Sequence, residues 1–134
     1  MKRTLLITAI LFSFLLTNGQ SAKKIYTDIQ NKKTKVMFHG FGTEPFWDIY
    51  IIDKSAIFAV ESEDIYEYWN TETTFDKSKY SQIIKLKNSI GEKLSLKIIN
   101  KSGNNGMSNK KFAYTVILDM RSFSFTGCGE LGNK

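Results

Sequence analysis

The sequence has little of the residue types from which most catalytic and metal sites are built. It contains one cysteine, one histidine and one proline. Because Cys128 is alone, no disulfide within the chain and no cysteine-cluster metal site can form. Because His39 is alone, metal motifs with two histidines, such as HExxH, are excluded. No GxSxG, P-loop or dinucleotide-binding motif occurs. We therefore predict no catalytic residue, no cofactor and no metal, and expect a protein that is not an enzyme.

No apolar run is long enough to cross a bilayer as a helix. Lys2 and Arg3 precede an uncharged run at 5–16, and the polar stretch 17–20 follows, which is the layout of a secretory signal peptide. The run has twelve residues, whereas a membrane-spanning helix needs roughly 20. No cysteine near this junction offers a site for a lipid anchor. We predict that residues 1–19 are a cleaved signal peptide, with an uncleaved interfacial helix as the alternative. The mature chain then has no transmembrane span and is periplasmic, secreted or on the cell surface.

The positive charge of the mature chain comes almost entirely from lysine. Removing Lys2 and Arg3 from the 19 basic residues leaves 17 against 13 acidic ones, a net charge of +4. Only Arg121 among these carries the planar guanidinium that suits phosphate and carboxylate recognition. The charge therefore indicates solubility and diffuse attraction to acidic surfaces. Together with the predicted export, it argues against a nucleic-acid partner.

Short segments rich in β-branched and aromatic residues, separated by turn residues, follow one another along residues 20–134. This length, about 115 residues, suits a single domain. Late segments alternate cleanly between apolar and polar residues, which is typical of antiparallel sheets with one wet face. We predict an all-β fold, a small antiparallel barrel or barrel-like sandwich of about eight strands, and prefer the barrel because it hides its edges. No convincing amphipathic helix is found, and 71–79 reads as a helical turn or an exposed connector. The predicted strands are 24–30, 35–41, 46–53, 56–61, 64–69, 80–88, 94–99, 112–118 and 123–126.

The stretch FGTEPFWDIYII reads as a turn that leads into a core strand. Gly42 gives the backbone freedom, and Pro45 directs Glu44 towards extended geometry. In the strand 46–53, we expect Trp47, Ile49 and Ile51 to face the core. The opposite face is either covered by a chain end or lines a mouth. We also expect Glu44 to be partly buried and to accept hydrogen bonds from the NNGMS loop.

Aromatic residues in DIYEYWN form a second candidate site. Tyr66, Tyr68 and Trp69 can present flat rings to a sugar or another apolar ligand, although simple strand packing is the alternative. Cys128 lies among small residues and is expected to be buried and inert. Pairing with another molecule, or reactivity assisted by His39, are the alternatives.

Three motifs together resemble an uncharacterised bacterial envelope family of membrane or lipoprotein-like proteins, sometimes found beside META-type domains. In this chain they read FGTEPFW, NNGMSNKKFAYTV and FTGCG, and the similarity covers about residues 36 to 129. The family pattern is G-[NT]-E-P-F-W, D-G-M-S-D with a following Y-P-Y-T, and G-C. The resemblance implies a small β domain in the envelope and gives no established reaction. The matching positions are Gly42, Glu44, Pro45, Phe46, Trp47, Gly106, Met107, Ser108, Tyr114, Gly127 and Cys128.

The chain departs from this pattern in the middle motif. Where the family pattern has a cysteine and two acidic residues, residues 103–109 read GNNGMSN. A disulfide between this loop and Cys128, or a cation site using those carboxylates, is therefore not expected here.

From these features we predict a non-enzymatic binding or interaction module of the envelope, which holds a small apolar molecule or an envelope protein at one barrel end. The alternative is an inhibitor of an envelope-degrading enzyme such as lysozyme, in which Glu44 or Ser108 enters the target's cleft. A hydrolase or thiol enzyme using Cys128 and His39 is a third possibility. An apolar, ring-lined interior favours the first, and a filled core with a projecting loop favours the second. The candidate contact residues are Glu44, Trp47, Tyr66, Trp69, Met107 and Ser108, and the structural motif residues are Gly42, Pro45, Phe46, Gly106, Gly127 and Cys128.

Overall fold

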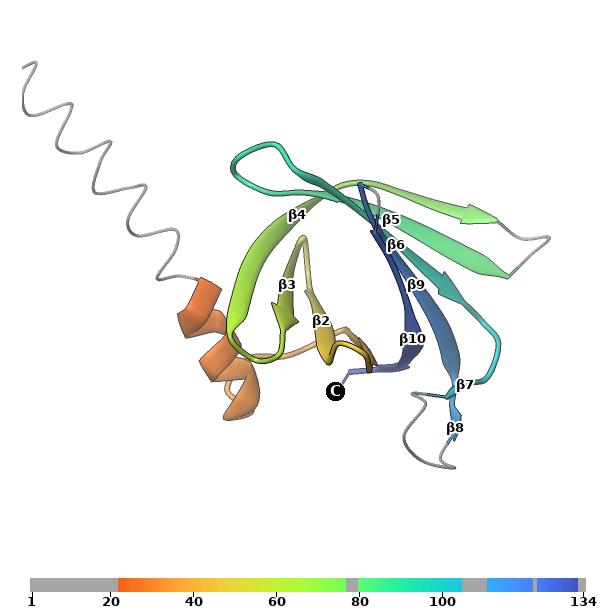
Figure 1. Ribbon diagram of the computed structural model, residues 1–134, viewed down its shortest axis with the longest axis horizontal. Helices are drawn as coiled ribbons and strands as arrows, with labels where there is room; N and C mark the ends of the chain where they lie inside the picture. The colour runs from red at the N-terminus through yellow and green to blue at the C-terminus, as the bar shows by residue number, and fades with distance from the viewer. Residues whose placement is uncertain (1–21, 77–79, 105–110, 122, 133–134) are drawn as a thin grey trace, which may run out of the picture.

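Eight antiparallel strands close into one barrel (Figure 1). The computed structural model describes residues 22–76, 80–104, 111–121 and 123–132. The strands follow one another around the barrel in the order β1-β10-β9-β6-β5-β4-β3-β2. The predicted small all-β barrel of about eight strands is therefore confirmed. The strands of the barrel are β1 Phe38–Gly42, β2 Trp47–Ile52, β3 Ser55–Val60, β4 Asp64–Asp76, β5 Ser81–Lys87, β6 Lys93–Ile99, β9 Tyr114–Met120 and β10 Phe123–Leu131.

Alternation along the strands fills the barrel with side chains. Leu94, Leu96 and Ile98 point inward from β6, and Val116 and Leu118 meet them from β9. Successive strand residues point to opposite faces, so each strand contributes every second residue to one core. The predicted core face of β2 is confirmed, because Trp47, Ile49 and Ile51 all belong to this cluster.

The segment predicted as a strand at 24–30 is instead a helix over residues 22–30, and it lies outside the barrel wall (Figure 1). Apolar residues recur at the helical positions Ala22, Ile25, Tyr26 and Ile29, and this period outweighs the β propensity of the individual residues. Both the strand prediction and the absence of an amphipathic helix were wrong. Lys32, in the turn that follows the helix, takes the left-handed conformation (φ 58°), as residues after helix ends commonly do.

The helix covers the outer face of β2 and β3. Ile29 packs with Tyr50 and Ile57 in a second apolar cluster, joined by Ile25 and Ile52. Of the two roles predicted for this face of β2, coverage by a chain end is the one observed at Tyr50 and Ile52. The cluster lies on the opposite side of the wall from the main core.

The turn before β2 differs from the expectation for Glu44. This residue has φ 64° and is exposed, rather than extended and partly buried. Only four residues, 43–46, reverse the chain between β1 and β2, so one of them takes the left-handed conformation. The Glu44–Pro45 peptide is cis. The loop expected to bond to Glu44 includes residues 105–108, which lie outside the described residues.

Strand β4 runs on where a helical turn or connector was predicted at 71–79. Its first part pairs with β3, and its second part, up to Asp76, pairs with β5 after a register shift between Asn70 and Glu72. The threonine-rich sequence favours this extended pairing. The far parts of β4 and β5 project beyond the rest of the barrel (Figure 1).

Two glycines make room for Trp47 on the inner face of the barrel. A Cβ atom on Gly42 would overlap the indole Nε1, and one on Gly127 would lie 2.8 Å from the indole Cζ2. Gly127 also lies against the Phe41 carbonyl so closely that no Cβ fits. Gly42 pairs with Trp47 across the β1–β2 ladder. The first and last motifs of the sequence are therefore joined in space as the two sides of one tryptophan seat.

A separate two-stranded sheet covers Cys128 on the outer face of β10. It consists of β7 Gly103–Asn104 and β8 Lys111–Phe112. A Cβ atom on Gly103 would lie 3.0 Å from the Cβ of Cys128, and the Phe112 ring meets Phe41 edge-on at 4.8 Å. The Cys128 thiol is fully buried, as predicted.

Candidate functional site: an aromatic mouth at one end of the barrel

Four turns gather at one end of the barrel, which we call the mouth end. They join β1 to β2, β3 to β4, β5 to β6 and β9 to β10. The first two turns are tied together, because the Glu61 backbone N–H donates to the Phe46 carbonyl (2.8 Å) and the Phe46 N–H donates to the Glu61 carboxylate (3.1 Å). The strand ends between these turns therefore open onto a common surface.

That surface is hollowed. The hollow, which we call the mouth, has a volume of about 370 Å³. Its lining comes from the inner faces of β3, β4 and β10, the end of β9 and the β5–β6 turn. The lining residues are Phe58, Val60, Tyr66, Tyr68, Asn88, Ile90, Glu92, Met120, Phe123 and Phe125.

The mouth exposes large apolar side chains around its edge. Tyr66 is 45% exposed, Phe123 is 67% exposed and Ile90 is 77% exposed. Phe58 and Tyr68 are buried and close the bottom of the mouth. Single apolar residues on a surface need no explanation, but several converging on one concave site mark a candidate binding site.

A few polar side chains lie beside these rings. The Asn88 side-chain oxygen accepts hydrogen bonds from the backbone N–H groups of Ile90 (3.2 Å) and Glu92 (2.8 Å), which fixes the turn. Burial raises the pKa of Tyr68, the negative charge of Glu92 adds to this, and a hydrogen bond with the Asn88 side chain opposes it. The Tyr68 hydroxyl is therefore protonated at neutral pH, close to a carboxylate.

The Glu92 carboxylate is the charged group that lines the mouth. Arg121, at the β9–β10 turn, places a guanidinium nitrogen 3.4 Å from a Glu92 oxygen. The Arg121 side chain is 77% exposed and that of Glu92 is 35% exposed. An ion pair this open to solvent holds its partners weakly. The mouth thus combines aromatic walls with one carboxylate that an exposed cation already approaches.

Only some of the predicted contact residues line the mouth. Tyr66 lines the mouth and Tyr68 forms part of its floor, but Trp69 lies on the outer face of β4. Tyr66 and Trp69 therefore do not form one aromatic platform, because an odd spacing along a strand puts them on opposite faces. Glu44 is at the mouth end without lining the mouth.

Trp47 lies behind the mouth rather than on its surface. Its ring centroid is 6.2 Å from that of Phe125, which lines the mouth, and the indole itself is buried. Trp47 therefore supports the wall of the mouth and has no surface to offer a partner directly. Gly106, Met107 and Ser108 lie outside the described residues.

Most residues of the mouth were missed by sequence reasoning. Phe58, Phe123 and Phe125 read as ordinary strand residues, Met120 lay beyond the predicted strand 112–118, and their convergence depends on which strands become neighbours. One local signal was available: Ile90 is an apolar residue inside the turn NSIGE, where polar residues are usual. Arg121 was noticed only as the single arginine after the predicted signal peptide.

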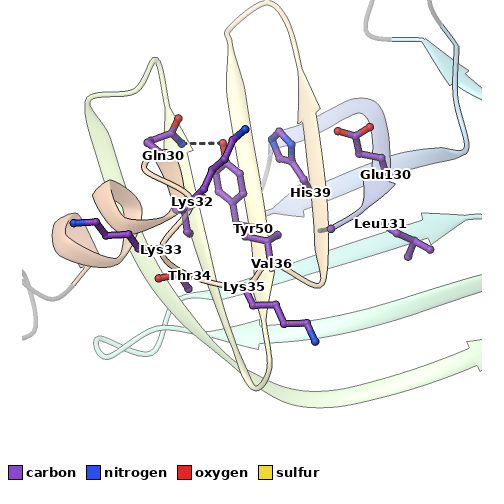
Figure 2. A pocket seen from close by; sticks show the side chains of 12 residues that line it. Gln30, Lys32, Lys33, Thr34, Lys35, Val36, His39, Tyr50, Glu130 and Leu131 are labelled. Atoms are coloured by element: carbon purple, nitrogen blue, oxygen red, sulfur yellow. Dashed lines mark hydrogen bonds between the residues drawn. The ribbon is translucent and has the colours of Figure 1, made fainter. Parts of the chain in front are cut away.

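A second hollow, of about 480 Å³, lies between the outer face of β1 and β10 and the segment that follows the helix (Figure 2). There, His39 Nε2 is 2.7 Å from an Asp48 carboxylate oxygen, and the imidazole stacks on Tyr50 at 4.3 Å. The Gln30 amide donates to the Tyr50 hydroxyl (3.1 Å). In this view Lys33 and Lys35 point away from the hollow, so they do not converge on a common ligand.

The groups of this hollow form a poor nucleophilic site. Burial, followed by the charge of Asp48, raises the pKa of Tyr50 to about 12, so the phenol keeps its proton at neutral pH. His39 is engaged with Asp48, and Cys128 lies under the outer two-stranded sheet.

The Cys128 thiol is expected to resist alkylation in the native protein. Burial, followed by the charge of Glu130, raises its pKa to about 11. Because the thiolate is the reactive form, both burial and protonation slow the reaction. At pH 8, we expect a thiol reagent to label the folded protein very slowly and the guanidinium-unfolded protein completely. Fast stoichiometric labelling of the folded protein would show that the thiol is accessible.

The same pKa shift predicts how stability changes at high pH. The unfolded chain loses the thiol proton near the ordinary pKa of 9.0, whereas the folded chain keeps it up to about 11. The contribution of this group to stability therefore falls as the pH rises from about 9 to about 11. Cys128→Ala removes that part of the pH dependence, which urea denaturation of both proteins across this range measures.

Within the described residues, no group of three or more histidine, cysteine, aspartate or glutamate side chains is placed to hold a metal ion. Within the same residues, no helix has the length and apolarity that a membrane span requires. Comparisons of the chain with protein-family models, with curated proteins and with solved structures found no match. The resemblance to the envelope family therefore stays a prediction from its motifs.

Proposed function

We propose that this protein is an exported, non-enzymatic binding module of the bacterial cell envelope, which holds a small apolar molecule at the mouth. The observation that carries the proposal is the convergence of exposed Tyr66, Ile90 and Phe123 on one concave site. The N-terminal charge and apolar pattern supports export.

The dimensions and chemistry of the mouth suit a small ligand. Its volume of about 370 Å³ falls in the range typical of small-molecule sites, roughly 300–1,000 Å³. Aromatic side chains offer a large contact area and have few rotatable bonds. The barrel interior below is filled by the main core, so a ligand lies at the end of the barrel rather than inside it.

Removing the aromatic edge of the mouth tests this function. The variants Tyr66→Ser and Phe123→Ser each delete an exposed ring, while Phe75→Ser deletes an exposed ring on the far part of β4. We expect each mouth variant to weaken binding of octanol about tenfold, which corresponds to the loss of about 1.4 kcal/mol of apolar contact. Backbone amide NMR titrations measure the affinity and locate the site.

In these titrations, Phe75→Ser is expected to bind like the parent protein. Equal weakening by all three substitutions would point to non-specific adsorption. If octanol produced no shifts at the mouth of the parent protein, the proposal would be wrong.

A proteinaceous inhibitor of an envelope-degrading enzyme such as lysozyme is the second candidate. Two observations favour it: the core is filled, and the turn with Glu44 is exposed at the mouth end. In that case the parent protein slows hydrolysis of cell walls by lysozyme, and Glu44→Gln reduces the inhibition. This role needs a protein surface rather than a pocket. Tyr66→Ser is therefore expected to leave the inhibition unchanged, whereas it weakens the binding of a small ligand.

A further inference from the structure

Beyond an apolar ligand in general, we infer that the mouth selects an amphiphilic organic cation, with an apolar body against the rings and one ammonium or guanidinium group beside Glu92. This inference rests on the proposed function and names the ligand class of the same site. Three features of the described residues carry it: the aromatic lining, the charge of the surrounding turns, and the contact between Glu92 and Arg121.

The first feature is the lining itself. Phe58, Tyr66, Tyr68, Phe123 and Phe125 bring five aromatic rings to one hollow. The face of an aromatic ring carries partial negative charge and attracts cations, especially where water is excluded. An aromatic hollow without a charged group would accept neutral ligands equally well. The carboxylate of Glu92, which belongs to the same lining, adds a preference for positively charged ligands.

The second feature is that the mouth end is acidic although the chain as a whole is basic. The full chain has a formal net charge of +6. In the described residues of the four turns at the mouth end, the acidic side chains are Glu44, Glu61, Glu63 and Glu92, and the basic one is Arg121.

Three more residues contribute to this difference in charge. Asp64 pairs with Val60, a residue of the mouth, so its side chain lies on the inner face of β4. Lys87 and Lys93 pair with each other on the outer face, opposite to Leu86 and Leu94 in the core. Glu92 therefore lines the mouth with further carboxylates in the turns at the same end, whereas Lys87 and Lys93, which flank the β5–β6 turn, lie on the outer face. Such a charge distribution attracts cations to the opening and repels anions.

The third feature is that a side chain of the protein already makes the contact assigned to the ligand. The Arg121 guanidinium lies 3.4 Å from the Glu92 carboxylate and is largely exposed. Since an exposed ion pair is weak and screened by salt, a ligand cation that also gains aromatic contacts competes with it. Arg121 then acts as a competitor for the site, and its removal favours a cationic ligand.

Three probes with one tail and different charge test this inference: octylammonium, octanol and octanoate, titrated at neutral pH and low salt with detection by backbone amide NMR. We expect octylammonium to bind about tenfold more tightly than octanol, as cation–aromatic and carboxylate contacts together allow. We expect octanoate to bind more weakly than octanol. Added salt is expected to reduce these differences.

Matched variants assign the preference to residues. Glu92→Gln keeps the shape of the side chain. We expect this variant to bind octylammonium and octanol with affinities within about twofold of each other, while its affinity for octanol equals that of the parent protein. Arg121→Ala is expected to raise the affinity for octylammonium about threefold. Asp53→Asn removes the same charge from the exposed turn at the opposite end, between β2 and β3, and is expected to change neither affinity.

The outcomes separate the two proposals. If octanol binds at the mouth but octanoate binds as well as octylammonium, the cation inference is wrong and the proposed function stands. If the preference for octylammonium survives in Glu92→Gln, the assignment to Glu92 is wrong. If none of the three probes shifts the amides of the mouth, both proposals fail.

Discussion

Replacing Trp47 by alanine is expected to lower the free energy of unfolding by about 3–5 kcal/mol, the range found when a large aromatic residue is deleted from a core. The indole is buried, packs near Phe125, and occupies space that Gly42 and Gly127 leave open. Because these two glycines have no side chains that could move into the cavity, we expect the surrounding structure to relax little. Urea denaturation followed by circular dichroism measures the change.

Two controls accompany this measurement. Trp69→Ala deletes the other tryptophan, which is exposed on the outer face of β4, and is expected to cost less than about 1 kcal/mol. Trp47→Phe keeps an aromatic ring in the seat and is expected to cost less than Trp47→Ala. A loss below about 1 kcal/mol for Trp47→Ala would contradict the packing described here.

Gly42→Ala is expected to destabilise the protein by about 1–3 kcal/mol, the usual cost of inserting a methyl group into a filled core. The three atoms nearest to the added Cβ all belong to the Trp47 indole. In a Trp47→Ala background, the same substitution should therefore cost almost nothing, and the two changes should be strongly non-additive. A double-mutant cycle with urea denaturation tests this.

Gly127→Ala provides the contrast. There the added Cβ meets the Phe41 carbonyl as well as the indole, and a backbone oxygen cannot move aside like a side chain. We expect its cost to remain in the Trp47→Ala background. Equal rescue of both glycine variants would show that the indole alone sets the space at Gly127. Gly40→Ala, whose added Cβ would meet only side chains at 3.1 Å or more, is expected to cost less than either.

These expectations separate stability from binding in the motif residues. Gly42, Trp47 and Gly127 build the tryptophan seat, whereas Tyr66, Phe123 and Glu92 line the mouth. The seat supports the mouth through Phe125, which contacts the indole and also belongs to the lining. Substitutions in the seat are therefore expected to change stability first, and substitutions at the edge of the mouth to change binding with little loss of stability.

Local patterns in the sequence determined the fold class and the inner face of several strands. Apolar residues at every second position, as in Leu94, Leu96 and Ile98, can be buried on one side only when the strand belongs to a sheet with one core. Cys128 was also expected to be buried, because small neighbours allow close packing. The signal-peptide pattern and the family resemblance are sequence features that remain predictions.

Local patterns failed where two periods or two backbone preferences competed. Residues 22–30 contain β-branched and aromatic residues, yet their apolar positions follow a helical period and match the outer face of β2 and β3. Glu44 precedes a proline, which favours extended geometry, but the short reversal between β1 and β2 placed it in the left-handed region. In both segments the partner surface or the chain reversal decided the conformation.

The sequence by itself determined an all-β fold of short antiparallel strands and favoured a barrel over a barrel-like sandwich, because alternation and turn residues act over a few neighbouring positions. Only the tertiary structure decided that Gly42 and Gly127 flank one indole and that Phe58, Glu92 and Phe123 share one mouth. The physical reason is the closure of the barrel: strand order and register bring distant residues together, and neither can be read from any single segment.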